Sequence, residues 1–247
     1  MIKRLLKTVI LLALVGGVAV WGYFAVRNRD ISINQWFVGG LELGVDVSSY
    51  QMDVDFGKLM EQGVKFAYIK ATEGSLHTDG SFAEKWAAAG EAGMPVGAYH
   101  YFSYESSGVK QAENFINTVG KLSGVDGNFL IPAIDMELST EQKANPPEKS
   151  EVVAALKAFL AVLEEEYGVK PLIYAERGYY DQYLAEDFSD YPRWVRNVFY
   201  PVWVDAGEGW LVWQYNDKGV LDGYGGEKYI DLNVINGKYG VDELRMK

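Results

Sequence analysis

Eight short apolar runs of strand length follow one another between residues 41 and 236, and helical patterns lie between the first five of them. Strands that alternate with helices predict a parallel sheet covered by helices. Because the helices thin out after the fifth run, we expect an α/β fold, a single irregular (β/α) TIM-like barrel with incomplete helices in its last third. Such barrels take about 250 residues as one domain, and this chain has 247. The expected strands are 41–48, 64–71, 94–102, 129–138, 170–176, 193–199, 209–216 and 229–236, and the expected helices are 55–62, 81–92, 109–122, 150–167 and 179–184.

The alternative architecture is an open, doubly wound sheet. That fold would be favoured by a Gly-x-Gly-x-x-Gly turn after the first strand. Residues 46–49 read Asp-Val-Ser-Ser instead, and no phosphate-binding loop is found in the sequence. The barrel is therefore the preferred interpretation.

An uncharged and almost wholly apolar run covers residues 8–26. Its length is close to the roughly 20 residues that cross a bilayer. Lys3, Arg4 and Lys7 precede the run, which favours a cytoplasmic N-terminus. We expect an uncleaved transmembrane helix that anchors the chain in the lipid bilayer of the cytoplasmic membrane. The alternative is a cleaved signal peptide, which would make the protein secreted.

These features divide the chain into a cytoplasmic stub and anchor (1–29), a linker (30–40) and an extracytoplasmic barrel domain (41–247). Residues 1–29 hold five of the 23 Lys and Arg residues and none of the 34 acidic ones, so the remainder carries a net charge of −16. This charge argues against nucleic acid as a partner, because nucleic-acid binders present basic faces. The chain has no cysteine, which excludes disulfides and a cysteine nucleophile.

The apolar segment PAIDMEL, residues 132–138, carries Asp135 and Glu137 two positions apart. Side chains of a strand alternate between faces, so both carboxylates point the same way, about 6–7 Å apart along the backbone. Crowding of like charges and desolvation raise the pKa of at least one of them. A protonated carboxyl beside an ionised one is the arrangement that glycoside hydrolysis requires. The alternative is an exposed edge strand with two solvated acids.

Other acids lie at the ends of strands. Asp46 ends the first strand and Asp231 opens the last. A closed barrel would bring both to one rim with the Asp135 pair, and functional groups of barrels gather at such a rim. Glu73, near Lys70 after the second strand, is a further candidate for this rim.

Aromatic side chains accompany the acids in the expected strands. Tyr99, Tyr174 and Trp213 are the candidates for a groove that binds sugar rings, because such rings have apolar faces. The alternative for each of them is a place in the hydrophobic core.

Two other chemistries are less favoured by the sequence. A serine hydrolase requires a serine–histidine pair, and neither His77 nor His100 lies near a nucleophile-elbow pattern. A second alternative is a magnesium or calcium site, because these ions prefer oxygen ligands, but a metal site has no need of groove aromatics. We therefore expect neither a metal nor another cofactor.

The part of the chain after the anchor resembles glycoside hydrolase family 25, the lysozymes (β-1,4-N-acetylmuramidases) that cleave peptidoglycan glycan strands. The matching segments occur in family order and cover nearly all of the chain outside the anchor. They are GVDVSSYQ (44–51), FAYIKATEG (66–74), GAYHYF (97–102), PAIDMEL (132–138), PLIYAE (171–176), VWQYN (212–216) and YIDLNVING (229–237). Ser49 and Arg193 depart from the family pattern, in which a larger polar residue and an apolar residue are expected.

The resemblance implies the irregular barrel and a set of roles. Glu137 matches the general acid, and Asp135 matches its partner, which stabilises positive charge at the reacting centre. Asp46 and Asp231 match the other two active-site aspartates of the family, and Tyr99 matches a tyrosine of the catalytic subsite. Either an aspartate or the N-acetyl carbonyl of the substrate then makes the bond to the sugar.

The resemblance predicts a peptidoglycan hydrolase that acts on the bond between N-acetylmuramic acid and N-acetylglucosamine. We expect the protein to be a monomer. Two alternatives stay open. The first is a non-catalytic glycan-binding barrel, although both acids of PAIDMEL are retained. The second is a chitinase-like glycosidase, although residues 132–134 lack the acids that chitinases carry before this pair.

Overall fold

A computed structural model describes residues 2–27, 32–120, 128–207 and 209–246. Eight strands close into a barrel in the order β1-β11-β9-β8-β7-β6-β5-β3, and β3 pairs with β1 to complete it. This closure confirms the barrel and rules out the open sheet. The eight strands are β1 (Leu43–Val47), β3 (Val64–Glu73), β5 (Val96–Tyr101), β6 (Ala133–Asp135), β7 (Leu172–Glu176), β8 (Arg193–Arg196), β9 (Val212–Gly219) and β11 (Ile230–Ile235).

One strand runs against the parallel arrangement that the sequence predicts. β11 is antiparallel to both of its neighbours, β9 and β1, whereas the other pairs of the barrel are parallel. Only residues 220–229, which contain the short strand β10 (Gly225–Gly226), separate β9 from β11. A connection without a crossover helix returns the chain antiparallel. The start of β11 therefore lies at the rim where the other strands end, and Asp231 pairs in register with Asp46.

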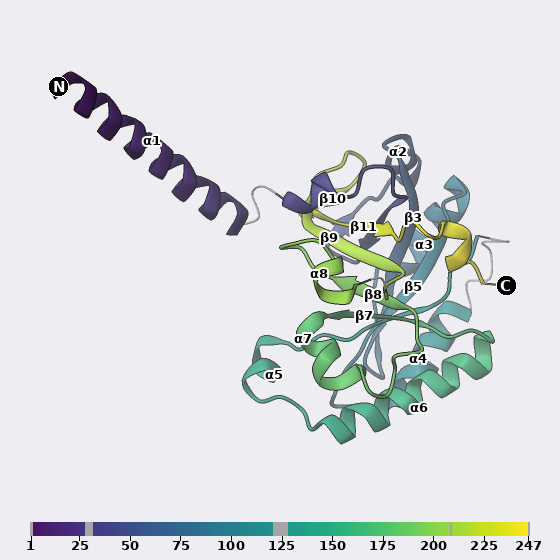
Figure 1. The fold of residues 1–247 in the computed structure, drawn as a ribbon. Helices are drawn as coiled ribbons and strands as arrows, with labels where there is room; N and C mark the ends of the chain where they lie inside the picture. Colours follow the sequence, from purple (N-terminus) through teal and green to yellow (C-terminus); the bar gives the residue numbers. More distant parts are fainter. Residues whose placement is uncertain (1, 28–31, 121–127, 208, 247) are drawn as a thin grey trace.

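Helices cover the outside of the barrel in its first part (Figure 1). Gly93 and Gly168 adopt the left-handed conformation that ends α3 and α6, as their positions in the sequence indicate. After β8 the only α-helix in the described residues is one turn long, which confirms the loss of helices in the last third. The end of the helix expected over 109–122 lies outside the described residues. The α-helices around the barrel are α2 (Phe56–Glu61), α3 (Phe82–Ala92), α4 (Gly108–Val119), α5 (Thr140–Ala144), α6 (Lys149–Tyr167), α7 (Arg177–Tyr179) and α8 (Trp203–Ala206).

Several short elements were not predicted from the sequence. They are η1 (Ile33–Trp36), β2 (Gln51–Met52), β4 (His77–Thr78) and η4 (Val241–Leu244), whereas η3 (Tyr180–Leu184, a turn of π-helix that continues α7) lies within the helix expected over 179–184. Each spans five residues or fewer, which is too short for hydrophobic periodicity to detect.

The alternation of side chains along the strands builds two hydrophobic clusters. One lies between the strands and the helices, and it includes Val45 and Val47 of β1. The other fills the inside of the barrel and includes Phe66, Tyr68 and Trp194. Inward positions near the rim are instead polar, and they form the site described below.

Gly44 of β1 makes room for the inner cluster. A Cβ at this position would lie 2.2 Å from Cζ of Phe66, which is buried against neighbours that leave it little room to move. We expect Gly44→Ala to lower the free energy of unfolding by about 1–3 kcal/mol, because the ring or the strand must shift. Urea unfolding measures the change.

The double variant Gly44→Ala/Phe66→Leu should recover part of that loss, and Gly39→Ala serves as the control. Gly39 has no heavy atom within 4 Å of an added Cβ. Additive effects of the Gly44 and Phe66 substitutions would contradict the steric explanation.

The N-terminal segment forms α1 (Ile2–Arg27), which extends away from the barrel (Figure 1). Within the part of the chain that the structure describes, no helix combines the length and the apolar character that crossing a membrane requires. The anchor and the boundaries expected at residues 29 and 40 stay predictions, and residues 28–31 of this region lie outside the described residues.

Candidate active site

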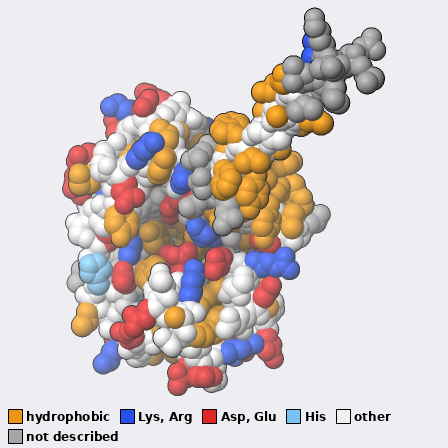
Figure 2. Space-filling model, turned by 90° about the vertical axis from the view of Figure 1, so that its left-hand side faces the viewer, with side chains coloured by type: hydrophobic (Ala, Val, Ile, Leu, Met, Phe, Trp, Pro, Cys, Tyr) orange, Lys and Arg blue, Asp and Glu red, His pale blue; other side chains and the backbone are white. Residues whose placement is uncertain are grey.

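A cavity of about 580 Å³ opens at the rim where the parallel strands end, which is a usual size for a small-molecule site. Acidic side chains gather around the hollow on this side of the barrel (Figure 2). Eight of the nine site residues predicted from the sequence line the cavity: Asp46, Lys70, Glu73, Tyr99, Asp135, Glu137, Tyr174 and Asp231. The barrel thus brings together residues that are up to 185 positions apart.

The Asp135–Glu137 pair points into the cavity as the alternation of strand side chains predicts. β6 ends at Asp135, but its pairing continues, because the N–H of Met136 donates to the carbonyl of Tyr174. The side chain of Met136 lies in the outer hydrophobic cluster. Asp135 and Glu137 on either side of it both line the cavity. The edge-strand alternative is therefore wrong, because β6 lies between β5 and β7.

Asp135 is the member of the pair whose environment disfavours charge. Burial raises the pKa of its carboxyl well above the usual range, and the charges of Glu137 and Asp46 add to this effect. Lys70 and Arg196 act in the opposite direction without cancelling it. Oδ1 of Asp135 is buried and has no hydrogen-bond partner in the protein. This atom is free to bind a polar group of a ligand.

Asp46 and Asp231 form a second pair of carboxyls on β1 and β11. Oδ2 of Asp46 accepts hydrogen bonds from Nε2 of Gln214 (3.0 Å) and Nδ2 of Asn233 (2.7 Å). Burial raises the pKa of Asp46, although these two hydrogen bonds oppose the shift. Burial, followed by the charge of Asp46, raises the pKa of Asp231 well above its usual range, and the two side chains share a hydrogen bond. The pair therefore holds a proton more readily than two solvated aspartates.

Glu137 lines the cavity with a partly exposed side chain. Its side chain is 35% exposed, and Nε of Arg196 lies 4.0 Å from Oε1. The hydroxyl of Tyr174 lies 3.3 Å from the same oxygen. Arg196 is itself paired with Asp217 at 3.0 Å. Glu137 can thus reach a bound substrate while groups of β7 and β8 hold it in place.

The remaining predicted residues lie along the wall of the cavity. Nζ of Lys70 forms an ion pair with Glu73 at 2.7 Å and lies 4.9 Å from the centre of the Tyr101 ring. Burial raises the pKa of the Tyr99 hydroxyl, which therefore stays protonated at neutral pH. These contacts place cationic, anionic and aromatic groups within one wall.

Trp213 is the one predicted site residue that lies elsewhere. It is 1% exposed, belongs to the outer hydrophobic cluster, and donates its indole N–H to the carbonyl of Asn197. The neighbouring Gln214 lines the cavity instead. The prediction was wrong because alternation along β9 directs Trp213 away from the barrel interior.

Sequence reasoning missed several groups of the site. Arg196, Gln214 and Asp217 line the cavity, and the fully buried Asn233 supports it from below. A signal was present, since Gln214 and Asn233 are amides within otherwise apolar strands. Asn233 also lies two positions from Asp231, on the same strand face. Trp194 of β8 and Tyr229 before β11 are aromatic side chains that line the cavity from this part of the barrel.

Comparison with known proteins gives this arrangement a family. Residues 45–224 match the model of the family described as Glycosyl hydrolases family 25. The chain belongs to this family. The matched residues include Asp46, Asp135 and Glu137, and Asp231 lies just beyond them. The family 25 match identifies the chain as a glycoside hydrolase.

Individual relatives of this family 25 hydrolase include an uncharacterized protein, a muramidase and a solved glycosyl hydrolase. The chain is 36% identical over 230 residues to the uncharacterized protein YegX of Escherichia coli K12, covering 91% of this chain and 79% of YegX. It is 30% identical over 216 residues to an N,O-diacetylmuramidase of Chalaropsis sp, covering 82% and 96%. A solved family 25 glycosyl hydrolase from Bacillus anthracis is 41% identical, with a TM-score of 0.74 and coverage of 83% and 94%.

Proposed function

We propose that this family 25 hydrolase is a muramidase (lysozyme) that cleaves the β-1,4 bond between N-acetylmuramic acid and N-acetylglucosamine in peptidoglycan. The observation that carries the proposal is the convergence of Asp46, Asp135, Glu137 and Asp231 in one cavity. The relationship to a muramidase supports the choice of substrate.

Glu137 is the general acid of the proposed reaction. It donates its proton to the glycosidic oxygen as the bond between that oxygen and C1 of the muramic acid breaks. The accessible position of its side chain at the mouth of the cavity suits this contact. After the leaving sugar departs, the carboxylate of Glu137 takes a proton from the water that attacks C1.

Asp135 orients the N-acetyl group of the substrate in this proposal. Its buried Oδ1 lacks a partner, and a buried acceptor gains from a substrate N–H. With the amide N–H held there, the acetyl carbonyl oxygen forms a bond to C1 as the leaving oxygen departs, and water later breaks that bond. The competing route uses an aspartate as the nucleophile. Peptidoglycan that lacks the N-acetyl group should resist cleavage by the first route but not by the second.

The full-length protein should therefore be incubated with purified peptidoglycan, and the released muropeptides identified by mass spectrometry. The expected products carry new reducing ends at N-acetylmuramic acid. New reducing ends at N-acetylglucosamine, or cleavage of chitin in preference to peptidoglycan, would overturn the assigned bond. Binding without new reducing ends would favour the glycan-binding alternative.

We also propose that α1 anchors the hydrolase in the cytoplasmic membrane, with the N-terminus inside and the barrel outside. The support comes from the apolar run at residues 8–26 and the lysines and arginine before it. Side chains at positions 9 and 26 of this run lie outside the described residues. Within the described part, large apolar side chains are exposed around the helix. They are Ile10, Leu11, Leu12, Leu14, Val15, Val18, Val20, Trp21, Tyr23 and Phe24.

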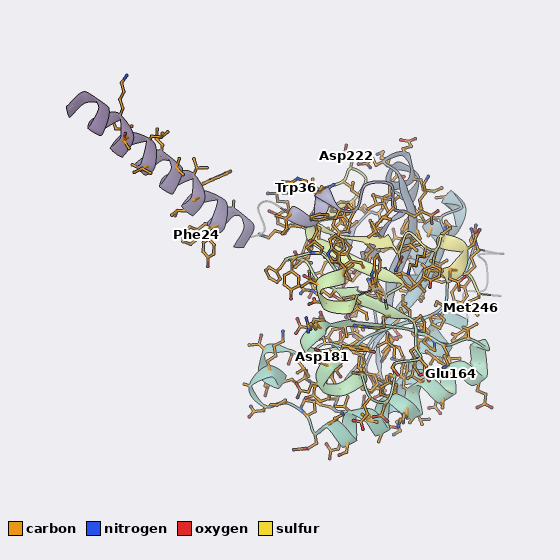
Figure 3. The ribbon with its side chains drawn as sticks, in the orientation of Figure 1. Phe24, Trp36, Glu164, Asp181, Asp222 and Met246 are labelled. Atoms are coloured by element: carbon orange, nitrogen blue, oxygen red, sulfur yellow. The ribbon has the colours of Figure 1, made fainter. Side chains whose placement is uncertain are left out.

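Exposed aromatic residues at the base of α1 fit this placement. Trp36 is 76% exposed (Figure 3), and the rings of Phe37 and Trp203 contact each other with their centres 5.1 Å apart. The connection through residues 28–31 allows about 18 Å at most between Arg27 at the end of α1 and Ser32. If α1 crosses the bilayer and leaves it near Arg27, then Trp36, Phe37 and Trp203 lie near the membrane interface. Aromatic side chains are favoured at this interface.

The absence of native cysteine allows a direct test of this topology. Single cysteines introduced by Lys3→Cys and Ser150→Cys should differ in intact cells. A membrane-impermeant maleimide should label the Ser150 variant, on exposed α6, but not the Lys3 variant. Release of the protein by alkaline carbonate, or loss of the residues before 27 from the mature chain, would overturn the anchor.

A further inference from the structure

A continuous chain of hydrogen bonds joins a buried indole to the carboxyl of Glu137. Its links are 2.7–3.3 Å long, and we name it the Trp194–Glu137 chain. Its members in order are Trp194, Asn233, Asp46, Gln214, Tyr174 and Glu137. Asn233 is fully buried and Gln214 is 3% exposed. Because water does not reach these amides freely, the direction of each hydrogen bond depends on the protein.

The indole of Trp194 sets the direction at one end. An indole N–H can only donate, and here it donates to Oδ1 of Asn233 at 2.8 Å. The amide of Asn233 is thereby oriented with Nδ2 toward Asp46, at 2.7 Å from Oδ2. Asp46 is therefore an acceptor in this arrangement, and it also shares a hydrogen bond with Asp231.

Gln214 extends this order of donors and acceptors from Asp46 to Tyr174. Its Nε2 donates to the same Oδ2 of Asp46 at 3.0 Å, so its Oε1 faces Tyr174 as an acceptor. The Tyr174 hydroxyl lies 2.9 Å from that Oε1 and donates to it. A hydroxyl has one proton, so this proton is not available to a second acceptor.

The orientation of the Tyr174 hydroxyl determines which protonation state of Glu137 it can bind. Oη of Tyr174 lies 3.3 Å from Oε1 of Glu137 and presents a lone pair to it. Two lone pairs at that distance repel, but a protonated Glu137 can donate its own proton to Oη. Arg196, 4.0 Å from the same carboxyl oxygen, has the opposite influence, because a cation favours the carboxylate.

We propose that Tyr174 and Gln214 are positioning residues that keep the transferable proton on Glu137 in the free enzyme, against the influence of Arg196. The proposal rests on the proposed role of Glu137 as the general acid. If Glu137 ionised, Tyr174 would have to turn its proton away from Gln214. The buried Oε1 of Gln214 would then have no donor, which is costly.

Titratable and charged groups on seven of the eight barrel strands lie around Glu137. They are Asp46 of β1, Tyr101 of β5, Asp135 of β6, Tyr174 of β7, Arg196 of β8 with its partner Asp217 of β9, and Asp231 of β11. Of these, the substitutions below remove only Tyr174, and Gln214 carries no charge. A change in the pH dependence of these variants therefore reflects altered hydrogen bonding. The exception is Gln214→Glu, which adds a negative charge.

The test is the pH profile of kcat/KM on purified peptidoglycan for the full-length protein. The variants are Gln214→Met, Tyr174→Phe and the double variant, with the fold checked by circular dichroism. In Gln214→Met the Tyr174 hydroxyl loses its acceptor and turns its proton to Glu137, which stabilises the carboxylate. We expect the alkaline limb to move to lower pH by about one unit, which is about a tenfold loss of kcat/KM above the limb. In the Tyr174→Phe background, Gln214→Met should move the limb no further.

Gln214→Glu should not lower the pH of the alkaline limb as Gln214→Met does. It keeps an acceptor oxygen for Tyr174 and adds a negative charge near Glu137, so the alkaline limb should stay at the wild-type pH or rise above it. The proposal is overturned if Gln214→Met lowers kcat/KM equally at all pH values. It is also overturned if Gln214→Met moves the limb equally with and without the Tyr174 hydroxyl.

The outcomes separate this inference from the proposed function. A wild-type protein that releases no muropeptides, or a fully active Glu137→Gln variant, refutes the proposed function. An active wild type, an inactive Glu137→Gln variant and independent effects of Gln214 and Tyr174 refute only the positioning role.

Discussion

Replacing Glu137 by glutamine should reduce the release of muropeptides from purified peptidoglycan about 10²–10⁴-fold, the range typical for loss of a general acid. Glutamine has the shape of glutamate but has no proton of suitable acidity to give to the glycosidic oxygen. The loss should appear in kcat, because the substitution leaves the walls of the cavity unchanged. Reducing-end assays at saturating peptidoglycan measure it.

The fold of the Glu137→Gln variant should persist. The side chain is 35% exposed and its ion-pair distance to Arg196 is 4.0 Å, so we expect a change in unfolding free energy within about 0.5 kcal/mol. Glu165→Gln, on an exposed position of α6, makes the same chemical change outside the cavity and should retain full activity. A Glu137→Gln variant with wild-type kcat would show that another group donates the proton.

The barrel could be predicted because its strands obey one simple rule. Alternation places Val45 and Val47 outside and Asp46 inside. In PAIDMEL it likewise places Met136 outside and the two acids inside. The reversal of β11 was not visible from composition or periodicity, because neither depends on strand direction. The short connection after β9 was the available sign.

The acids of the site could also be predicted, whereas their supporting groups could not. A carboxyl in an apolar strand stands out in the sequence, but its partners depend on the register between distant strands. Gln214 and Asn233 bind Asp46 from 168 and 187 positions away. Trp213 shows the same limit, because an aromatic side chain fits a core as well as a groove, and only the face of β9 decides between them.

Replacing Asp135 by asparagine should have two opposite effects, a loss of activity of at least about 10²-fold and a gain in stability at neutral pH. The loss follows from the removal of a carboxyl beside the reacting centre. The gain follows from burial, because a desolvated carboxyl close to Glu137 and Asp46 disfavours the folded state when it is ionised. We expect about 0.5–2 kcal/mol, as for other active-site groups whose function costs stability. Urea unfolding at pH 7.5 measures the gain.

The pH dependence of stability gives the sign of this effect independently. The pKa of Asp135 in the folded protein is raised well above 3.8, so between these two values the folded state binds a proton that the unfolded chain does not. Stability from this group is therefore present at low pH and is lost as pH rises through the folded pKa. In Asp135→Asn that loss disappears, and the advantage of the variant over wild type should shrink as pH falls toward 4.

Asp222→Asn is the matched control, because Asp222 is exposed and lies outside the residues that line the cavity. It should change neither activity nor the slope of stability against pH. A destabilised Asp135→Asn variant would mean that the free Oδ1 of Asp135 is bound in solution by a donor such as water. In that case the carboxyl would be solvated in the free enzyme, and the case for a substrate N–H at this atom would lose its physical basis.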